Sequence, residues 1–199
     1  PISILVQNQD QRSRDYGNIM NTYRPGHADY TFDEKYGFRD YRGGGRSSGR
    51  ETTARVAAGA VAAKILKELG IEVHAYTKAI GPVSVPENEY HPEEIFQNPI
   101  YMPNNAYAKK ASAYLEECIK NQDSSGGIIE CVVTGMPVGI GDTVFEKLDA
   151  NLAKAMLSIG AVKGFEIGDG FKAADAKGSI NNDSFHTNDG RITKDTNHA

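Results

Sequence analysis

Apolar side chains recur along the chain with two different periods, which predicts a protein that mixes helices and strands. Four segments have a strand pattern, and they are residues 2–8, 71–80, 128–133 and 162–168. Three have the helical period, and they are residues 50–69, 105–121 and 144–158. An Asn-Asp-Gly turn at 188–190 predicts a β-hairpin near the end. The expected fold class is therefore α/β (α+β), with helices between strands.

Three of these segments allow a more detailed prediction. Ser48 and Glu51 have the spacing of a capping box, and Gly70 supplies a stop, so one helix fills the residues between them. Its many alanines favour close packing on several sides. The apolar run 128–133 is typical of a buried strand. By contrast, residues 7–46 have few apolar side chains and predict an extended loop with little regular structure, a kind of segment that is often functional.

The bulk properties place limits on the class of protein. With 199 residues, of which 39% are hydrophobic, the chain can bury one sizeable core, so we expect a single domain over 1–199. Apolar runs are too short for a membrane span and no secretion signal is present, so a cytoplasmic location is expected. Cys118 and Cys131 are expected to be reduced. Neither end resembles a natural terminus, which suggests the central portion of a longer chain.

Charge is distributed unevenly. The net charge is −4, which argues against a general nucleic-acid binder, yet eight of the nine arginines lie between Arg12 and Arg55. Glycines 43–45 leave backbone N–H groups accessible, and the start of the following helix adds its positive end. The arginines nearest this loop are Arg39, Arg42, Arg46 and Arg50. This segment predicts a site for a multiply charged anion.

Other interpretations of the same segment stay open. The glycines could form a flexible linker, or Gly44 and Gly49 could belong to a phosphate-binding loop of a nucleotide-dependent phosphotransferase, although Arg50 and Glu51 replace its Lys and Ser or Thr. A non-enzymatic anion or RNA-binding module is a further alternative. His27 is suited to proton transfer, but a loop histidine is more often an ordinary surface residue. No histidines or cysteines have metal-ligand spacing, so no metal is expected.

Three blocks resemble one family. RPGHADYTFDEKYG (24–37), RDYRGGGRSSGRETTARVAAGAVAAKIL (39–66) and VFEKLDANLAKAMLSIGAVKGFEIGDGF (144–171) are similar to consecutive blocks of chorismate synthase. The resemblance implies a β-α-β sandwich with helices packed between sheets. It also implies a 1,4-anti elimination of phosphate from 5-enolpyruvylshikimate 3-phosphate that gives chorismate and requires reduced FMN, in the shikimate pathway to aromatic amino acids. Some members reduce the flavin with NADPH and others use an external reductant, which these residues do not decide.

The resemblance also implies roles for individual residues. His27 matches a catalytic histidine beside the flavin. Flavin contacts are implied for Arg46, Ser47, Ser48, Gly160 and Ala161, and substrate-anion contacts for Arg24 and Arg50. Gly49 and Gly160 stand where other members have a side chain, and small residues there still allow close approach. The implied partners are the small-molecule substrate and further copies of the chain in a homotetramer, with no nucleic acid and no membrane.

Several blocks of the family have no counterpart in this sequence. They include an N-terminal block with a second catalytic histidine and a C-terminal Lys-Pro-Thr-Ser-Ser block that surrounds the flavin phosphate. About half of the family's active site is therefore expected here. We expect this chain to be inactive alone.

Overall fold

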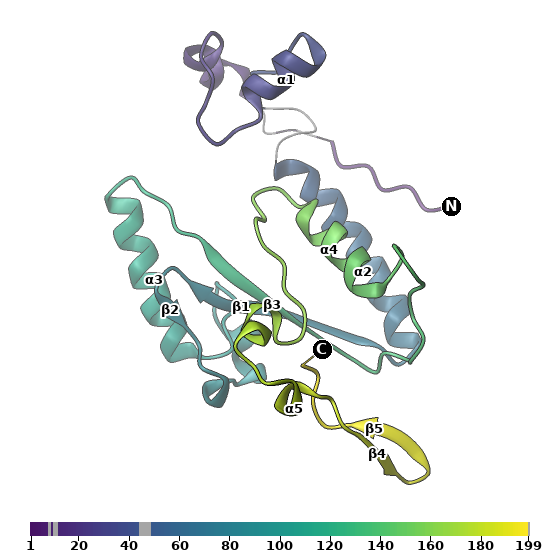
Figure 1. Cartoon of the computed structure of the whole chain (residues 1–199). Coiled ribbons are helices and arrows are strands. Elements are labelled where there is room, and N and C mark those ends of the chain that lie inside the picture. The colour runs from purple at the N-terminus through teal and green to yellow at the C-terminus, as the bar shows by residue number, and fades with distance from the viewer. Residues whose placement is uncertain (8, 10–11, 44–48, 199) are drawn as a thin grey trace. The chain divides into compact units, whose positions relative to one another are not determined.

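The computed structural model describes residues 1–7, 9, 12–43 and 49–198, which form helices, strands and connecting loops (Figure 1). These residues divide into two units. The first unit consists of Pro1–Ala58 and Val138–Ala199, and the second of Gly59–Pro137. The prediction of one domain over 1–199 concerns the whole chain and stays a prediction.

An antiparallel sheet of three strands organises the second unit. Its order is β2-β1-β3, with β1 at Glu72–Ile80, β2 at Val83–Ser84 and β3 at Gly127–Thr134. A tight turn joins β1 to β2, and Gly81 within it has a φ of +51° that favours glycine. The strands predicted at 71–80 and 128–133 are thereby confirmed.

The side chains of β3 are more exposed than its sequence suggests. Ile128 is 59% exposed and Ile129 is 68% exposed, so the expectation of a buried strand is wrong for this chain. The physical reason is position, because β3 is an edge strand that pairs only with β1 among the described residues. An apolar sequence indicates that burial of the strand would be favourable. Burial also needs a neighbouring segment that covers the strand, and the apolar sequence does not show whether there is one.

Helix α3 covers the part of the sheet near β2 and completes the core of this unit (Figure 1). It spans Asn105–Lys120, which confirms the predicted helix, and the Asn104 side chain caps it by accepting bonds from two backbone N–H groups at 3.0 and 3.2 Å. The buried side chains of the core are Val85, Met102, Ala108 and Ala111. Two 3-10 helices, η4 at Glu87–Glu89 and η5 at Pro92–Gln97, connect β2 to α3.

Helix α2 runs from Thr52 to Glu68 and follows a 3-10 turn, η3, at Gly49–Glu51. Its end is a Schellman motif, because the Ile71 N–H bonds to the carbonyl of Leu66 at 2.9 Å and Gly70 has a φ of +77°. The predicted stop is confirmed. Ser48 of the predicted capping box lies outside the described residues. The prediction of close packing is wrong, since α2 has no buried residue.

The N-terminal part of the first unit differs from its prediction. A 3-10 helix, η1, spans Ser13–Ile19 and an α-helix, α1, spans Asp29–Tyr36, where only loop was expected. Helix α1 is stabilised by polar contacts and not by an apolar stripe. The strand predicted at 2–8 is wrong for the described residues 2–7, which lack a partner strand.

The remainder of the first unit contains short elements. These are α4 at Leu148–Leu157, η6 at Gly170–Ala174, α5 at Gly178–Asn181, β4 at Phe185–Asn188 and β5 at Arg191–Lys194. The hairpin is confirmed, and Asp189 and Gly190 have the positive φ values of a type I′ turn. Helix α4 begins four residues later than predicted. The strand predicted at 162–168 is wrong, because no neighbouring segment pairs with these described residues.

Two further findings bear on the class of protein. Within the described ranges, no helix is both long enough and apolar enough to cross a membrane. Cys118 and Cys131 are both free thiols.

Candidate active site

A tight turn at Arg24–His27 presents the candidate catalytic histidine. The His27 N–H bonds to the carbonyl of Arg24 at 3.3 Å, with Pro25 and Gly26 at the central positions. Gly26 has a φ of +73°, which is the left-handed conformation that a type II turn requires after proline. The Pro-Gly pair therefore specifies the turn locally. His27 lies at its end and is exposed.

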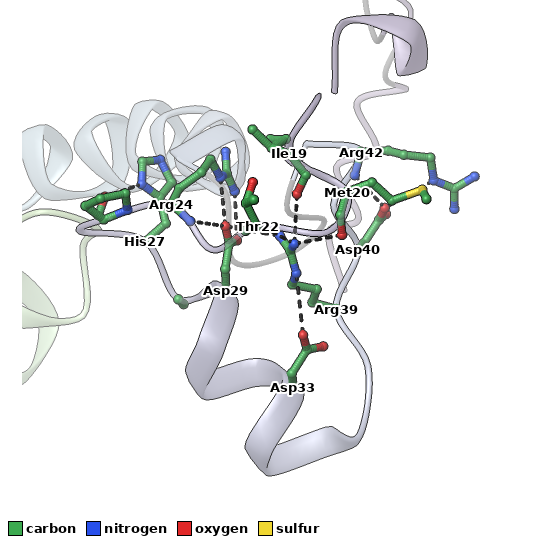
Figure 2. Close-up of polar contacts among 12 residues, drawn as sticks. Ile19, Met20, Thr22, Arg24, His27, Asp29, Asp33, Arg39, Asp40 and Arg42 are labelled. Atoms are coloured by element: carbon green, nitrogen blue, oxygen red, sulfur yellow. Dashed lines mark hydrogen bonds and ion pairs between the residues drawn. The ribbon is translucent and has the colours of Figure 1, made fainter. Parts of the chain in front are cut away.

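The imidazole of His27 folds back onto its own turn. Its Nδ1 lies 3.1 Å from the carbonyl oxygen of Pro25 (Figure 2). A carbonyl oxygen only accepts hydrogen bonds, so Nδ1 carries the proton of this bond. The other ring nitrogen, Nε2, is then the one left for an external partner.

Asp29, the first residue of α1, closes the turn from the other side. Its Oδ2 accepts the backbone N–H of Arg24 at 3.1 Å and Arg24 Nε at 2.9 Å, while Oδ1 accepts Arg24 Nη2 at 2.9 Å. This forked geometry is the strong form of an arginine–carboxylate pair. Asp29 is buried, so the carboxylate is held within the protein and not in solvent.

A second arginine completes the cluster around this carboxylate. Arg39 Nη1 lies 3.1 Å from Asp29 Oδ2, and Arg39 Nε lies 3.5 Å from Asp33 Oδ2. Arg39 Nη2 donates to the carbonyl oxygens of Ile19, Met20 and Thr22 at 2.8 to 3.0 Å (Figure 2). The side chain is only 8% exposed. Arg39 therefore joins η1 to α1 and is not available as an anion ligand.

The contacts of this cluster have an electrostatic consequence. Hydrogen bonds from the Arg24 side chain hold the pKa of the Asp29 carboxyl well below its usual range, although burial alone would raise it. The same hydrogen bonds raise the pKa of Arg24, although burial alone would lower it. Asp29 is therefore ionised throughout the neutral range.

Sequence reasoning did not identify Asp29 or Arg39 as partners. Asp29 looked like one of several acids in the segment, and Arg39 looked like a candidate anion donor. A usable signal existed, since an arginine before Pro-Gly and an aspartate just after it can meet across the turn. Recognising that pair would have predicted that the Arg24 side chain is held by a carboxylate of its own chain.

The predicted substrate ligand Arg50 lies near the same region. A Cβ atom built at Gly43 would lie 3.6 Å from Tyr16 Oη and 3.8 Å from Arg50 Nη1, so these two side chains flank Gly43. Tyr16 is thus close to Arg50. The flavin contacts predicted for Arg46, Ser47 and Ser48 lie outside the described residues. Residues 37–43 before them contain no strand, which counts against a phosphate-binding loop of the P-loop type.

The second predicted flavin segment lies at the end of α4. Arg55 Nη1 donates to Ser158 Oγ at 2.7 Å and Arg55 Nη2 to the Ser158 carbonyl at 3.3 Å, which joins the start of α2 to the residues just before Gly160. A Cβ atom at Gly160 or at Gly49 would meet nothing within 4 Å. Ala161 has a φ of +69°, a conformation unusual for a residue with a side chain.

The second unit contains a different concavity. A cleft of about 300 Å³ lies over β1 and β3, and its lining residues are Tyr76, Lys78, Val85, Pro86, Glu87, Tyr90, Pro103, Glu130 and Val132. None of the sequence-predicted site residues lines it. Two of its charged groups, Lys78 and Glu130, are paired, since Glu130 accepts from Tyr76 at 2.7 Å and from Lys78 at 2.9 Å. Within the described ranges, no group of three His, Cys, Asp or Glu side chains could hold a metal ion.

Comparison with known proteins matches the whole chain to one family. The family model for chorismate synthase matches residues 1–199. The chain is 62% identical over 199 residues to chorismate synthase of Agathobacter rectalis and 50% identical over 203 residues to that of Cytophaga hutchinsonii, covering all of this chain and 54% and 56% of those proteins.

A solved structure gives the same result. It is described as "Crystal Structure of Chorismate Synthase", is 31% identical, and superposes with a TM-score of 0.78 over 86% of this chain and 56% of its own. The predicted α+β fold class is thereby confirmed. The chain spans about half the length of the curated relatives it matches. By sequence and by fold, this chain belongs to the chorismate synthase family.

Proposed function

We propose that this chain carries part of the active site for the elimination reaction that chorismate synthases catalyse. In that reaction the bond from a ring carbon to the phosphate oxygen of 5-enolpyruvylshikimate 3-phosphate breaks, a hydrogen leaves another ring carbon, and the new double bond gives chorismate. The conversion is redox-neutral overall and requires reduced FMN. Support comes from the family match over residues 1–199 and from three features of the first unit.

The observation that carries the proposal is the bond between Arg55 and Ser158. The two flavin-contacting segments implied by the family, Arg46–Ser48 and Gly160–Ala161, are more than 100 residues apart in the sequence. Arg55, shortly after the first segment, donates to Ser158, just before the second. Segments that contribute to one ligand site need such a connection.

The residues present fit a flat, largely apolar cofactor with polar edges. Gly160 and Gly49 leave open space where a side chain would stand, so the backbone can be approached closely. The α-helix that starts at Thr52 offers its positive end nearby. Reduced FMN, when bound, supplies the electron density that eases departure of the phosphate. Arg46, Ser47, Ser48, Gly160 and Ala161 are the residues that would hold it.

The remaining roles belong to side chains with suitable chemistry. The substrate carries one phosphate and two carboxylates, and Arg24 and Arg50 would bind these anions. Arg50 lies beside Gly43, the first residue of the glycine run 43–45, which supports a place for it in the anion-binding region. Arg24 keeps a quarter of its side-chain surface exposed while it is paired with Asp29. His27 would hold or deliver a proton at Nε2.

The proposal extends to assembly and location. As in its family, the chain would act in a homotetramer in the cytoplasm, with NADPH as the flavin reductant in members that have their own reductase activity. Because it spans about half of its relatives, we propose that it does not turn over substrate alone. Chorismate formation by this chain, followed by absorbance under anaerobic conditions with reduced FMN, would contradict that part of the proposal.

Flavin binding by the chain tests the site itself. We would measure FMN fluorescence quenching with and without 5-enolpyruvylshikimate 3-phosphate, on the chain and on Arg46→Ala and Gly160→Leu. The expected result is binding that tightens with substrate and weakens at least tenfold in both variants. A leucine at Gly126 is the matched control, because that glycine also has nothing within 4 Å of a built Cβ but lies in the second unit. Equal loss in Gly126→Leu and Gly160→Leu would count against the assigned site.

A further inference from the structure

We propose that Asp29 is a positioning residue that fixes the tautomer of His27, so that Nε2 is the ring nitrogen presented to the reacting group. The proposal deepens the proposed function, because it rests on the role of His27 in that function. The juxtaposition that carries it is a buried carboxylate on one side of the Arg24–His27 turn and a histidine on the other, both bonded to the backbone of that turn (Figure 2).

The hydrogen bond of the His27 ring fixes which of its nitrogens carries the proton. The two nitrogens of a neutral imidazole are not equivalent, and the hydrogen bond made by one decides which state the other takes. Nδ1 of His27 faces the Pro25 carbonyl at 3.1 Å, which only a protonated nitrogen can satisfy. Nε2 then has a lone pair when the ring is neutral and an N–H when it is charged. Either way, Nε2 is the atom through which the ring exchanges a proton.

The Pro25 carbonyl is held in position by the bonds that Asp29 makes to the turn. His27 is exposed, so packing around the ring cannot fix its orientation, and the constraint must come from the backbone of the turn. Asp29 supplies it with three bonds to one residue, since its carboxylate accepts the backbone N–H, Nε and Nη2 of Arg24. Arg24 is the first residue of the turn. A carboxylate bonded to both its backbone and its side chain limits how the turn can rotate.

Asp29 is itself held in place by burial and by Arg39. It is the first residue of α1 and is 6% exposed, and Arg39 lies against it from the far side at 3.1 Å. Arg39 is in turn bonded to three backbone carbonyls of the 19–22 segment. Arg39 therefore holds Asp29, Asp29 holds the turn, and the turn orients the His27 ring. Asp29 does not touch the reacting atoms, and its effect is indirect.

The chain offers a matched control for this argument. Asp33 lies on the same helix and also pairs with Arg39, at 3.5 Å, but no bond joins it to Arg24 or to the turn among the described contacts. Asp33→Asn removes a carboxylate from the same cluster without touching the turn. Arg24→Gln removes the two side-chain bonds to Asp29, keeps the backbone N–H bond and leaves the buried pair of Asp29 and Arg39 in place, so it serves if Asp29→Asn disturbs folding.

The test is the tautomer of His27, read from the two imidazole nitrogen shifts in the full chain labelled with 15N-histidine. Spectra are recorded near pH 8, where an unperturbed imidazole is neutral. The signals of His27 are identified by their loss in His27→Gln. We expect a protonated Nδ1 and an unprotonated Nε2 in the unmodified chain and in Asp33→Asn. In Asp29→Asn and Arg24→Gln both shifts should move towards those of a mixture in which the Nε2–H form is a major species.

Two results would overturn the proposal. One is an unprotonated Nδ1 in the unmodified chain. The other is an unchanged tautomer in Arg24→Gln or in folded Asp29→Asn, with folding judged from the amide signals of α1 and α4, which lie in the same unit as Asp29. The readout needs no flavin and no substrate. A failure of FMN binding would therefore count against the proposed function alone, and a tautomer indifferent to Asp29 against this inference alone.

Discussion

Two regions of this chain are held together by opposite means. In the first unit, the segment around α1 depends on a buried carboxylate, Asp29, and two arginines that surround it. In the second unit, the contacts between the sheet and α3 depend on apolar side chains around Met102, which is fully buried. The first region should respond to charge and pH, and the second to lost volume. The residues of the proposed function that lie among the described ones belong to the first unit, including the exposed His27 at the end of its turn.

The largest expected effect is in the apolar core. Met102→Ala should lower the free energy of unfolding of the second unit by about 2–5 kcal/mol, because the lost side chain leaves a cavity that can collapse only in part. Hydrogen exchange of the α3 amides measures it. Ile119→Ala, within α3 itself, is the control, since Ile119 is 72% exposed, and should change stability by less than about 0.5 kcal/mol. Equal effects of the two variants would show that this core does not carry the stability.

A smaller effect is expected when the charged cluster loses Arg39. Arg39→Met should cost about 2–3 kcal/mol of local stability, less than the full range for a broken buried ion pair because Arg24 still neutralises Asp29. Three backbone carbonyls also lose their donor. Hydrogen exchange over residues 19–39 should accelerate while the α3 amides stay protected.

The control for this prediction is an arginine with an exposed partner. Arg42 pairs with Asp40 at 3.3 Å, and its side chain is 55% exposed. Arg42→Met should cost less than about 1 kcal/mol, as exposed ion pairs usually do. If Arg39→Met proves as mild as Arg42→Met, the description of Arg39 as the residue that holds the cluster together is wrong.

The elements of the fold that could be predicted from sequence are those whose signals are local. Helix α3 has a side-chain cap at Asn104, α2 has a glycine stop at Gly70, and the β4–β5 hairpin has its Asp-Gly turn. The strands predicted at 2–8 and 162–168 failed because a strand exists only with a partner, and alternation along one segment does not reveal the partner. Helix α1 was missed because polar contacts stabilise it and an apolar stripe does not.

The same distinction applies to the candidate site. Family blocks indicate which residues are important, and the structure adds how His27, Arg24 and Arg50 are placed. It also shows different surroundings for similar arginines, which composition cannot separate. The Arg39 guanidinium contacts backbone carbonyls and carboxylates, whereas Arg50 lies beside Gly43 and Tyr16. Pairing across a turn depends on backbone geometry that a count of charges does not contain.

Acid should weaken the charged cluster before the apolar core. Hydrogen bonds from Arg24 depress the pKa of Asp29, so its contribution to stability is present above the unfolded-state pKa of about 3.9 and is lost as the pH falls below it. The loss should be smaller than in Arg39→Met, because the bonds from Arg39 to three carbonyls remain. Amide signals of α1 should keep their positions from pH 7 to about 4 and change below that, ahead of those of Ala108 and Ala111. Changes confined to the range between pH 7 and 5 would point to another titrating group.

Alkali should act on the other region, through Tyr76. Burial, and then the hydrogen bond to Glu130, raise the pKa of Tyr76, so the folded state favours the neutral phenol. The resulting stability is present below the unfolded-state pKa of about 10 and is lost as the pH rises further.

Tyr76→Phe removes this bond and should cost about 1 kcal/mol at neutral pH, since Lys78 still pairs with Glu130. Hydrogen exchange of the β1 and β3 amides measures that cost at neutral pH, and tyrosinate absorbance follows the phenol in alkali. The cost of Tyr76→Phe should shrink above about pH 10, whereas Tyr101→Phe, at an exposed side chain, should have little effect at any pH. A Tyr76 that ionises together with the exposed tyrosines would show that the cleft is open to water, and the contrast between an acid-sensitive first unit and an alkali-sensitive second unit would then fail.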